Sequence, residues 1–446
     1  MKKSSPDVRL KGTLQVPGDK SISHRSVMIG SLAKGTTHVS GFLSGADCLS
    51  TISCFRKMGI GIEQNGDCVT VTGKGMHGLS APLSGDVLDC GNSGTTMRLI
   101  SGILSAQHFS SVLTGDESLC KRPMKRIIDP LSEMGADIRS LSGNGCAPLS
   151  ITGKNLTGIR FLNPVASAQV KSSVLFAGLY ADSETTVIEP FLSRDHTERM
   201  LKMFGADVKT RFERKTGSGK DEGRYCITVQ PAAELSAAEI KVPGDISSAA
   251  YFMAAALMVP GSDILLQNVG INPTRSGILD VLEKMGAEIE VASFHANGGA
   301  EPSADLHVCF QTGLHGTEIG GPLIPRLIDE IPIIAALCCT ATGTTVIKDA
   351  AELKVKESNR IRAMVEGLQK IGADVTETDD GMVINGSGGK LFSAAEIDAK
   401  KDHRIAMTFT LLGLVTEEGN IPLSREDADS VRISYPGFFE DLRSLL

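Results

Sequence analysis

The sequence contains no tryptophan, and only 4% of its 446 residues are aromatic. Because hydrophobic residues nevertheless make up 41% of the chain, its core must be built largely from aliphatic side chains. No apolar run approaches the ~18 residues that a membrane-spanning helix needs, and the N-terminus leads into no apolar signal segment. We therefore expect no membrane partner.

Runs rich in lysine and arginine are also missing, and the net charge is -7. This balance disfavours a nucleic-acid partner, so any anionic ligand must be held by locally placed cations. The ten cysteines are scattered without a C-x-x-C pair, which predicts reduced thiols and a cytoplasmic location. The nine histidines lack metal-ligand spacing, so no metal is expected.

Several catalytic motifs are absent as well. The sequence has no P-loop, no G-x-S-x-G elbow, no H-E-x-x-H and no G-x-G-x-x-G that opens a helix after a strand. These absences argue against nucleotide-phosphate hydrolysis, serine hydrolase chemistry, zinc peptidases and dinucleotide-dependent oxidoreductases.

What the chain does contain is an internal repeat. Five apolar-periodic segments end in a glycine that precedes a short strand-like stretch, at Gly59, Gly135, Gly205, Gly286 and Gly372. Such a glycine suits a left-handed helix C-cap, because it has no Cβ to clash there. A second series of β-branched strands runs out of phase, with weaker copies at 110–113 and 420–423. Together they predict six units of about 75 residues.

Each unit opens with a helix that is apolar nearly all round, as at 249–259, 331–339 and 405–415. A helix without a polar face must be buried. The expected N-caps of the six helices are Ser21, Asn92 or Ser93, Ser167, Asp245, Asp329 and Asp402.

The sixth unit lacks its closing strand, and the N-terminus can supply one. Residues 8–16 read as a strand that ends in Val16-Pro17-Gly18-Asp19, nearly the same phrase as Val242-Pro243-Gly244-Asp245. We therefore expect two domains, residues 19–244 and residues 1–18 plus 245–446, each made of three units.

Charged residues cluster where the helices begin. A helix N-terminus presents unpaired N–H groups and a positive dipole end, which suit phosphate or carboxylate. Singly, each segment could be a capped helix with solvated charges. Charges on helices without a solvated face must instead meet a ligand or each other. The set comprises Lys20, Arg25, Arg122, Arg194, Lys356, Arg360 and Arg404, against the carboxylates of Asp329 and Glu357. It predicts an anion-clamping site with two carboxylates available for proton transfer.

Six of these segments, in chain order, resemble the 5-enolpyruvylshikimate-3-phosphate synthase family. They are Pro17-Gly18-Asp19-Lys20-Ser21, Gly91-Asn92-Ser93-Gly94-Thr95, Lys121-Arg122-Pro123, Ser167-Ala168-Gln169, Val355-Lys356-Glu357-Ser358 and Asp402-His403-Arg404. The resemblance implies an α/β (α+β) fold of two domains. Each domain has three βαβαββ repeats around buried parallel helices, and the active site lies in the interdomain cleft. It also implies a monomer that needs no cofactor or metal.

The resemblance further implies residue roles. Shikimate 3-phosphate would be held by Ser21, Arg25, Ser167, Ala168, Gln169, Arg194, Asp329 and Lys356. Phosphoenolpyruvate would be held by Lys20, Gly94, Arg122, Gln169, Arg360 and Arg404, with Asn92 and His403 in support.

The reaction implied is addition followed by elimination. The methylene carbon of phosphoenolpyruvate is protonated while the 5-hydroxyl of shikimate 3-phosphate attacks C2, and the adduct then loses phosphate. Glu357 is assigned as the acid and Asp329 as the base, with Lys20 as an alternative proton carrier.

Three positions qualify the resemblance. Many relatives have a lysine in the C-terminal segment where this chain has Arg432 out of register by one, and an arginine at Ser118. Gly94 leaves room for glyphosate, which predicts sensitivity to it.

Two other functions compete with this interpretation. A UDP-N-acetylglucosamine enolpyruvyl transferase would have a cysteine where Glu117 stands. A non-catalytic anion-binding homologue would keep the cations and lose the acid and base.

Overall fold

The computed structural model describes residues 8–214, 223–295 and 301–446. The chain divides into two compact units: unit 1 comprises 1–17 and 243–446, and unit 2 comprises 18–242. Both boundaries fall inside the repeated Val-Pro-Gly-Asp phrase. Each unit has a hydrophobic core of its own.

Unit 2 contains three four-stranded sheets within its described residues. In each sheet a parallel pair of strands is extended by an antiparallel hairpin, in the orders β13-β2-β4-β3, β5-β6-β8-β7 and β9-β10-β12-β11. The strands are β2 (Lys34–Ser40), β3 (Gly61–Asn65), β4 (Cys68–Lys74), β5 (Leu88–Asp89), β6 (Ser110–Thr114), β7 (Asp137–Ser140), β8 (Leu149–Thr152), β9 (Arg160–Leu162), β10 (Thr185–Glu189), β11 (Val208–Arg214), β12 (Gly223–Val229) and β13 (Glu239–Lys241).

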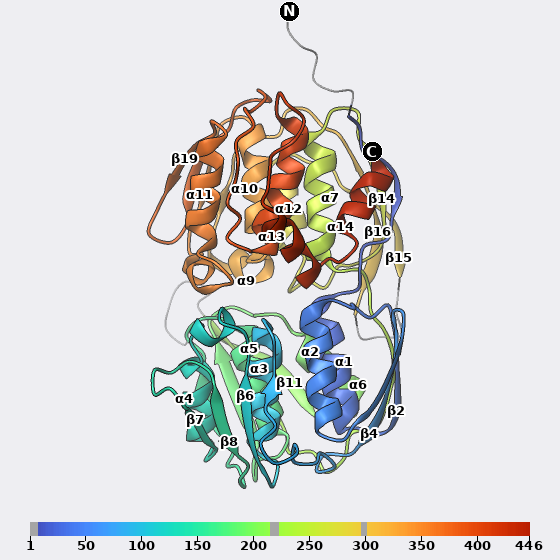
Figure 1. The fold of residues 1–446 in the computed structure, drawn as a ribbon, viewed down its shortest axis with the longest axis vertical. Helices are drawn as coiled ribbons and strands as arrows, with labels where there is room; N and C mark the ends of the chain where they lie inside the picture. The colour runs from blue at the N-terminus through green and yellow to red at the C-terminus, as the bar shows by residue number, and fades with distance from the viewer. Residues whose placement is uncertain (1–7, 215–222, 296–300) are drawn as a thin grey trace, which may run out of the picture. The chain divides into compact units, whose positions relative to one another are not determined.

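The helices of unit 2 are α1 (Lys20–Leu32), α2 (Ala46–Lys57), α3 (Gly94–Leu104), α4 (Lys125–Glu133), α5 (Ala168–Gly178) and α6 (His196–Met203), with a 3-10 turn η1 (Leu119–Lys121) (Figure 1). Helices α1, α3 and α5 are almost wholly buried, and α3 packs against both of the others. They therefore form the core on which the sheets lie, as their apolar sequences predicted.

Unit 1 repeats this arrangement with two four-stranded sheets among its described residues, in the orders β1-β14-β16-β15 and β17-β18-β20-β19. The N-terminal strand pairs with β14 in parallel, with Lys11 aligned with Asp263. The strands are β1 (Lys11–Leu14), β14 (Asp263–Gly270), β15 (Glu290–His295), β16 (Ser303–Cys309), β17 (Glu318–Ile319), β18 (Thr344–Ile347), β19 (Asp374–Glu377) and β20 (Met382–Asn385).

Three buried helices, α7 (Ile246–Met258), α10 (Ile331–Thr340) and α12 (His403–Leu412), pack against one another inside unit 1 (Figure 1). The remaining elements are α8 (Gly277–Lys284), α9 (Ile324–Leu327), α11 (Arg360–Lys370), α13 (Arg425–Ser430), α14 (Phe438–Leu445), η2 (Gly321–Leu323), η3 (Ala351–Val355), η4 (Gly413–Val415) and η5 (Val431–Ile433). None of the helices in the described part of the chain combines the length and apolarity needed to cross a bilayer.

The sixth repeat departs from the prediction. The expected strand at 420–423 does not form, and only isolated bridges join Phe392 to Thr416 and Ile397 to Leu423. Pro422 explains this, because it has no N–H to donate to a ladder.

The helix ends confirm the predicted glycine C-caps. The five repeat glycines all adopt positive φ, at 84° for Gly59, 94° for Gly135, 95° for Gly205, 89° for Gly286 and 89° for Gly372. This left-handed conformation lets the chain leave each helix and enter the next strand.

Two predicted N-caps were wrong. Asp19, not Ser21, caps α1, because its Oδ1 accepts from the backbone N–H of Ile22 at 2.9 Å. Helix α10 begins after Glu330 without a side-chain cap. There Pro332 removes one N–H that a cap would bind, and Asp329 turns to cationic side chains instead.

The other predicted caps hold their positions. Ser93, rather than Asn92, caps α3 by accepting from the N–H of Thr96 at 3.1 Å. Asp245 and Asp402 cap α7 and α12 through their side chains. Ser167 occupies the cap position of α5 without a side-chain hydrogen bond.

Candidate active site

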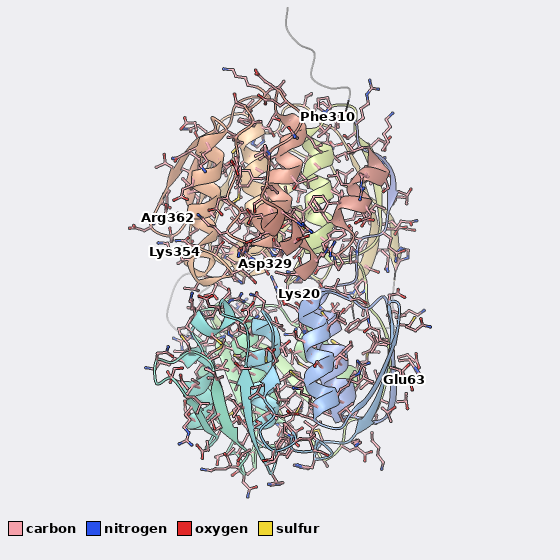
Figure 2. The ribbon with its side chains drawn as sticks, viewed as in Figure 1. Lys20, Glu63, Phe310, Asp329, Lys354 and Arg362 are labelled. Atoms are coloured by element: carbon pink, nitrogen blue, oxygen red, sulfur yellow. The ribbon has the colours of Figure 1, made fainter. Side chains whose placement is uncertain are left out.

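The first two turns of α1 place two predicted cations in unit 2. Lys20, labelled in Figure 2, forms an ion pair with Asp47 of α2. Arg25, one turn later, donates from Nε to Thr197 Oγ1 at 2.7 Å and from Nη2 to Ser172 Oγ at 2.8 Å. With 3% of its surface exposed, Arg25 ties α1 to α5 and α6.

The start of α3 lies between two guanidinium groups. Arg122 donates to the side-chain oxygen of Asn92 at 2.6 Å and to its backbone oxygen at 3.2 Å. A Cβ on Gly94 would lie 2.8 Å from Nη1 of Arg98 and 3.6 Å from Nη1 of Arg122. Two arginines beside a helix N-terminus are suited to bind a carboxylate or phosphate.

A side-chain amide connects the start of α5 to the start of α3. Gln169, in the first turn of α5, accepts from Arg98 through Oε1 and donates from Nε2 to Thr95 Oγ1 at 3.0 Å. Its two interactions fix the orientation of its amide group. They also hold Arg98 against the side of α3 where Gly94 lies.

Behind these groups a buried histidine joins three helices. His24 Nδ1 lies 2.7 Å from Thr51 Oγ1, which lies 2.7 Å from Thr96 Oγ1, which in turn donates to Ser93 Oγ at 2.8 Å. Burial, and then the charges of Lys20 and Arg25, lower the pKa of His24 well below its usual value. It is therefore neutral at pH 7 and adds no charge beside the cations.

A second buried group supports the segment that precedes α6. Lys171 lies 2.8 Å from Glu198 and 3.3 Å from Glu189, and it donates to the backbone oxygen of Ser193 at 3.0 Å. Burial lowers the pKa of Lys171, but the two carboxylates raise it more, so the amine stays charged. The segment held in this way carries Arg194, which is half-buried.

Unit 1 carries the predicted carboxylates, gathered around one arginine. The guanidinium group of Arg360 donates to Asp402 at 2.8 Å, Glu357 at 2.6 Å and Asp329 at 3.2 Å. Only 1% of Arg360 is exposed. Burial lowers its pKa, but these three carboxylates raise it more, so Arg360 is a permanent cation at the centre of the cluster.

Asp329, labelled in Figure 2, lies just before α10 and meets two further cations. Its Oδ1 is 3.5 Å from Nζ of Lys356, and its Oδ2 is 4.0 Å from Nη2 of Arg404. Burial lowers the pKa of Arg404, but the charge of Asp329, together with other neighbouring groups, raises it overall.

The three carboxylates around Arg360 differ in how much of each side chain is exposed, and this difference indicates different roles. The Asp402 side chain is fully buried, whereas those of Asp329 and Glu357 keep 12% and 19% of their surface exposed. Burial opposes ionisation of Asp402, but Arg360 and other interactions lower its pKa overall. Asp402 is thus a fixed anion that orients Arg360 and caps α12, while Asp329 and Glu357 remain accessible to a ligand.

Comparison with known proteins identifies the family. The model of the EPSP synthase (3-phosphoshikimate 1-carboxyvinyltransferase) family matches residues 5–442. The 3-phosphoshikimate 1-carboxyvinyltransferase of Bacillus velezensis is 54% identical over 98% of this chain and 97% of its own. The Bacillus subtilis protein of that name is 53% identical over the same shares. The chain belongs to the EPSP synthase family.

The fold agrees with a solved member of the EPSP synthase family. The structure of EPSP synthase from Acinetobacter baumannii superposes with a TM-score of 0.83 at 47% sequence identity, and the match covers 98% of this chain and 96% of the other. The mixed α/β architecture expected from the sequence is therefore confirmed.

The remaining residues predicted from the EPSP synthase resemblance lie at the same helix starts. The backbone oxygen of Ser21 accepts from Nη1 of Arg25 at 3.0 Å. Ser167 and Ala168 form the N-cap and first residue of α5, and His403 is the buried first residue of α12. In unit 2 hydrogen bonds link Arg98 to Gln169, Asn92 to Arg122, and Arg25 to Ser21.

Sequence reasoning missed several partners. Arg98 closes the Gly-rich motif and lies one turn after Gly94, so helical spacing was a usable signal. Asp47 had no such signal, because its partner Lys20 is on another helix. Asp402 was recognised only as a cap, although it also binds Arg360.

The two departures from the EPSP synthase pattern have different surroundings. Ser118 accepts from Nη2 of Arg122 at 3.3 Å, so it contacts a predicted ligand residue. Arg432 is exposed in η5. Glu117, where the nucleotide-sugar enzyme would have cysteine, pairs with Lys121 at 2.6 Å.

Proposed function

We propose that this chain transfers the enolpyruvyl group of phosphoenolpyruvate to the 5-hydroxyl of shikimate 3-phosphate and releases phosphate, a step of aromatic amino-acid biosynthesis. The observation that carries this proposal is the match to the EPSP synthase family across residues 5–442. The partly exposed Asp329 and Glu357, each next to fixed cations, supply the groups that the reaction needs.

We assign shikimate 3-phosphate to unit 2. Its ligands would be Ser21, Arg25, Ser167, Ala168, Gln169 and Arg194, with Asp329 and Lys356 of unit 1 completing the set. The polar first turns of α1 and α5 support this assignment, because their N–H groups and hydroxyls suit a phosphate on a polyhydroxylated ring.

We assign phosphoenolpyruvate to the cations. Lys20, Gly94, Arg122 and Gln169 would meet it from unit 2, and Arg360 and Arg404 from unit 1, with Asn92 and His403 in support. Gly94 supports the assignment, since the missing side chain leaves space between Arg98 and Arg122. Arg98 joins this set because it lies within reach of the same space.

The proposed chemistry begins with addition. Glu357 gives a proton to the methylene carbon of phosphoenolpyruvate, while Asp329 accepts the proton of the 5-hydroxyl as its oxygen bonds to C2. In the elimination step a methyl proton returns to the enzyme and the C2–O bond to phosphate breaks. The nearby cations stabilise the carboxylate and the departing phosphate. Lys20 is the alternative proton carrier.

Two alternative functions are disfavoured by the sequence. A UDP-N-acetylglucosamine enolpyruvyl transferase would use a cysteine where Glu117 stands, and this position argues against it. A non-catalytic homologue would have lost the acid and base, whereas Asp329 and Glu357 are both retained.

We also propose a cytoplasmic monomer. None of the ten cysteines, all of which lie in the described residues, forms a disulfide, which suits a reducing compartment. Sedimentation at micromolar concentration should give a single species near 47.1 kDa.

Phosphate release from phosphoenolpyruvate tests the function. Release with shikimate 3-phosphate, and none with UDP-N-acetylglucosamine, is the expected result. Release with the nucleotide sugar alone would reassign the acceptor. No release with either acceptor, combined with calorimetric binding of shikimate 3-phosphate, would favour the binding protein.

A further inference from the structure

A cluster of metal-ligating side chains lies on the outer face of the β1-β14-β16-β15 sheet, apart from the helix starts described above. His307 and Cys309 are two residues apart on β16, so they project from the same face. Asp263 on β14 is the direct cross-strand partner of Cys309. The intervening Val308 is buried in the core, which directs its two neighbours outward.

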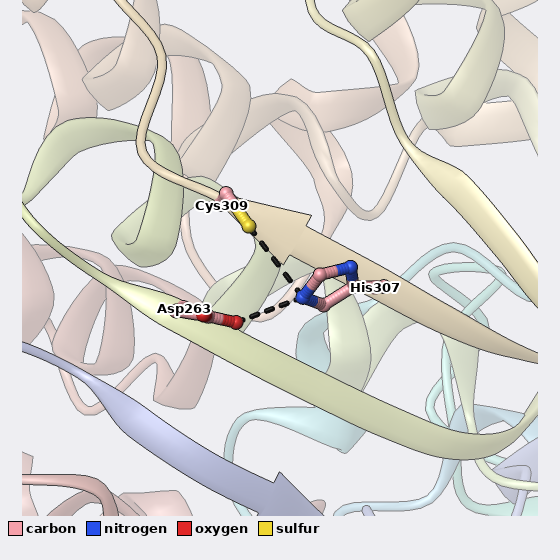
Figure 3. Close-up of side chains that lie close together, drawn as sticks. All are labelled: Asp263, His307 and Cys309. Carbon is pink, nitrogen blue, oxygen red and sulfur yellow. Dashed lines mark hydrogen bonds and ion pairs between the residues drawn. The ribbon is translucent and has the colours of Figure 1, made fainter.

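The three side chains converge on a single nitrogen. Nε2 of His307 lies 2.8 Å from Oδ1 of Asp263 and 3.5 Å from Sγ of Cys309. All three ligand atoms lie within 4.8 Å of one another. Figure 3 shows the side chains of Asp263 and Cys309 beside the ring of His307. In a tetrahedral zinc site with bonds of about 2.0–2.3 Å, ligand atoms are about 3.3–3.6 Å apart. The sulfur–nitrogen separation already fits, and the exposed Asp263 carboxylate needs to move by about half an ångström.

A second carboxylate orients the histidine ring. Oε2 of Glu290, the cross-strand partner of His307 on β15, lies 3.1 Å from Nδ1 of His307. Metal-bound histidines commonly donate their other N–H to a carboxylate, which fixes the tautomer that leaves Nε2 as the ligand. The cluster thus has both the ligands and the outer support of a metal site.

We propose that Asp263, His307 and Cys309 bind a divalent cation of the zinc class, with Glu290 orienting His307. A ligand set of nitrogen, sulfur and oxygen favours zinc over magnesium or calcium, which prefer oxygen alone. The thiol releases its proton to solvent on binding, and water fills the fourth position. Lys11, aligned with Asp263 across β1 and β14, opposes cation binding and keeps the affinity moderate.

Calorimetry with zinc chloride tests the site. The full-length chain, reduced, free of any affinity tag and stripped of metal, should bind about one Zn²⁺. His307→Ala should abolish this binding. Cys309→Ser and Glu290→Gln should weaken it by about 10- to 100-fold. With Co²⁺ as the probe, wild type should show a thiolate-to-metal absorption band in the near ultraviolet, and Cys309→Ser should lose it.

Two matched controls separate this site from adventitious binding. His295 on β15 pairs with Asp305 at 2.9 Å on the same sheet, and Cys68 is an exposed thiol on unit 2. His295→Ala and Cys68→Ser should bind metal as wild type does. No saturable Zn²⁺ binding, or a Co²⁺ band that survives in Cys309→Ser, would overturn the proposal. Unchanged thermal unfolding of the stripped variants would show that they are folded.

Discussion

The carboxylate side chains around Arg360 in unit 1 differ in exposure, and their exposure determines which of them can contact a substrate. Asp402 has no exposed surface and serves Arg360, whereas Glu357 keeps 19% of its side chain exposed while it accepts one hydrogen bond from Arg360. A glutamine at position 357 could still accept that hydrogen bond. It could not deliver a proton, so the substitution isolates acid catalysis from structure.

Glu357→Gln should therefore lower kcat by about 10²- to 10⁴-fold. Binding of shikimate 3-phosphate should change only a few-fold, because that ligand is assigned mainly to unit 2. Phosphate release measures the first quantity and calorimetry the second. Glu366→Gln, an exposed position on the same helix α11, is the matched control and should be fully active. Wild-type kcat in Glu357→Gln would remove Glu357 from the chemistry.

His24 gives a pH prediction with a definite sign. Its folded pKa lies well below the unfolded value of about 6.5, so its contribution to stability is complete above that pH and declines as the pH falls. At pH 5.5 the loss should reach about 1.4 kcal/mol. His24→Gln keeps a partner for Thr51 but does not titrate.

Chemical denaturation at pH 7.5 and 5.5 measures this difference. Wild type should lose about 1.4 kcal/mol more between the two pH values than His24→Gln does. His38→Gln, at an exposed histidine on β2, should behave as wild type. Equal losses in wild type and His24→Gln would mean that His24 is not held neutral.

At the scale of single residues, the sequence predicted which types of residue gather at the candidate site. It did not predict which side chains pair with one another. Arg360 could be assigned to an anion site from its motif, yet two of its three carboxylate partners, Asp329 and Asp402, come from distant segments of the chain. The Lys20–Asp47 pair and the Lys171–Glu198 pair likewise join different helices. No local spacing encodes such contacts, because they arise only when helices pack.

Among the helical elements, α3 begins in close contact with a guanidinium group. Gly94 is its first residue, and an added Cβ would lie 2.8 Å from Nη1 of Arg98. That contact is too close for carbon and nitrogen, so Arg98 must move. A displaced Arg98 would also lose its hydrogen bond to Gln169.

Gly94→Ala should therefore raise the KM for phosphoenolpyruvate by about tenfold, equivalent to about 1.4 kcal/mol. Glyphosate inhibition, expected for the wild type, should weaken at least as much because less space remains. The KM for shikimate 3-phosphate serves as the internal control and should stay within about twofold. An unchanged phosphoenolpyruvate KM would place that substrate away from Gly94.

Element type followed from the sequence where the pattern was strong. The all-apolar helices and the glycine C-caps were predicted because a buried helix and a left-handed turn each leave a clear local signature. The helix start at Asp329 was misassigned, because Asp is a good cap in general and only tertiary contacts show it facing Arg360. The prediction of a strand at 420–423 was wrong because it gave β-branched residues more weight than Pro422.

For the molecule as a whole, the main consequence of the fold is that unit 1 is built from both ends of the chain. Strand β1 adds to β14, and α14 packs against β1. Leu10, just before β1, is fully buried in the unit 1 core, whereas Thr13 on the strand is exposed. A substitution near residue 10 should thus weaken structure that is encoded after residue 243.

Leu10→Ala should destabilise the protein by about 2–5 kcal/mol, the range for truncating a buried leucine. Thr13→Ala should cost less than about 0.5 kcal/mol, because it removes little buried surface. Hydrogen exchange locates the effect: in Leu10→Ala, protection should fall in β14 and α14, while the strands of unit 2 keep their wild-type rates. Faster exchange in unit 2 alone would contradict the assignment of β1 to unit 1. Equal acceleration in both units would mean that they unfold as one cooperative body, so that the two cores are separate in packing but not in stability.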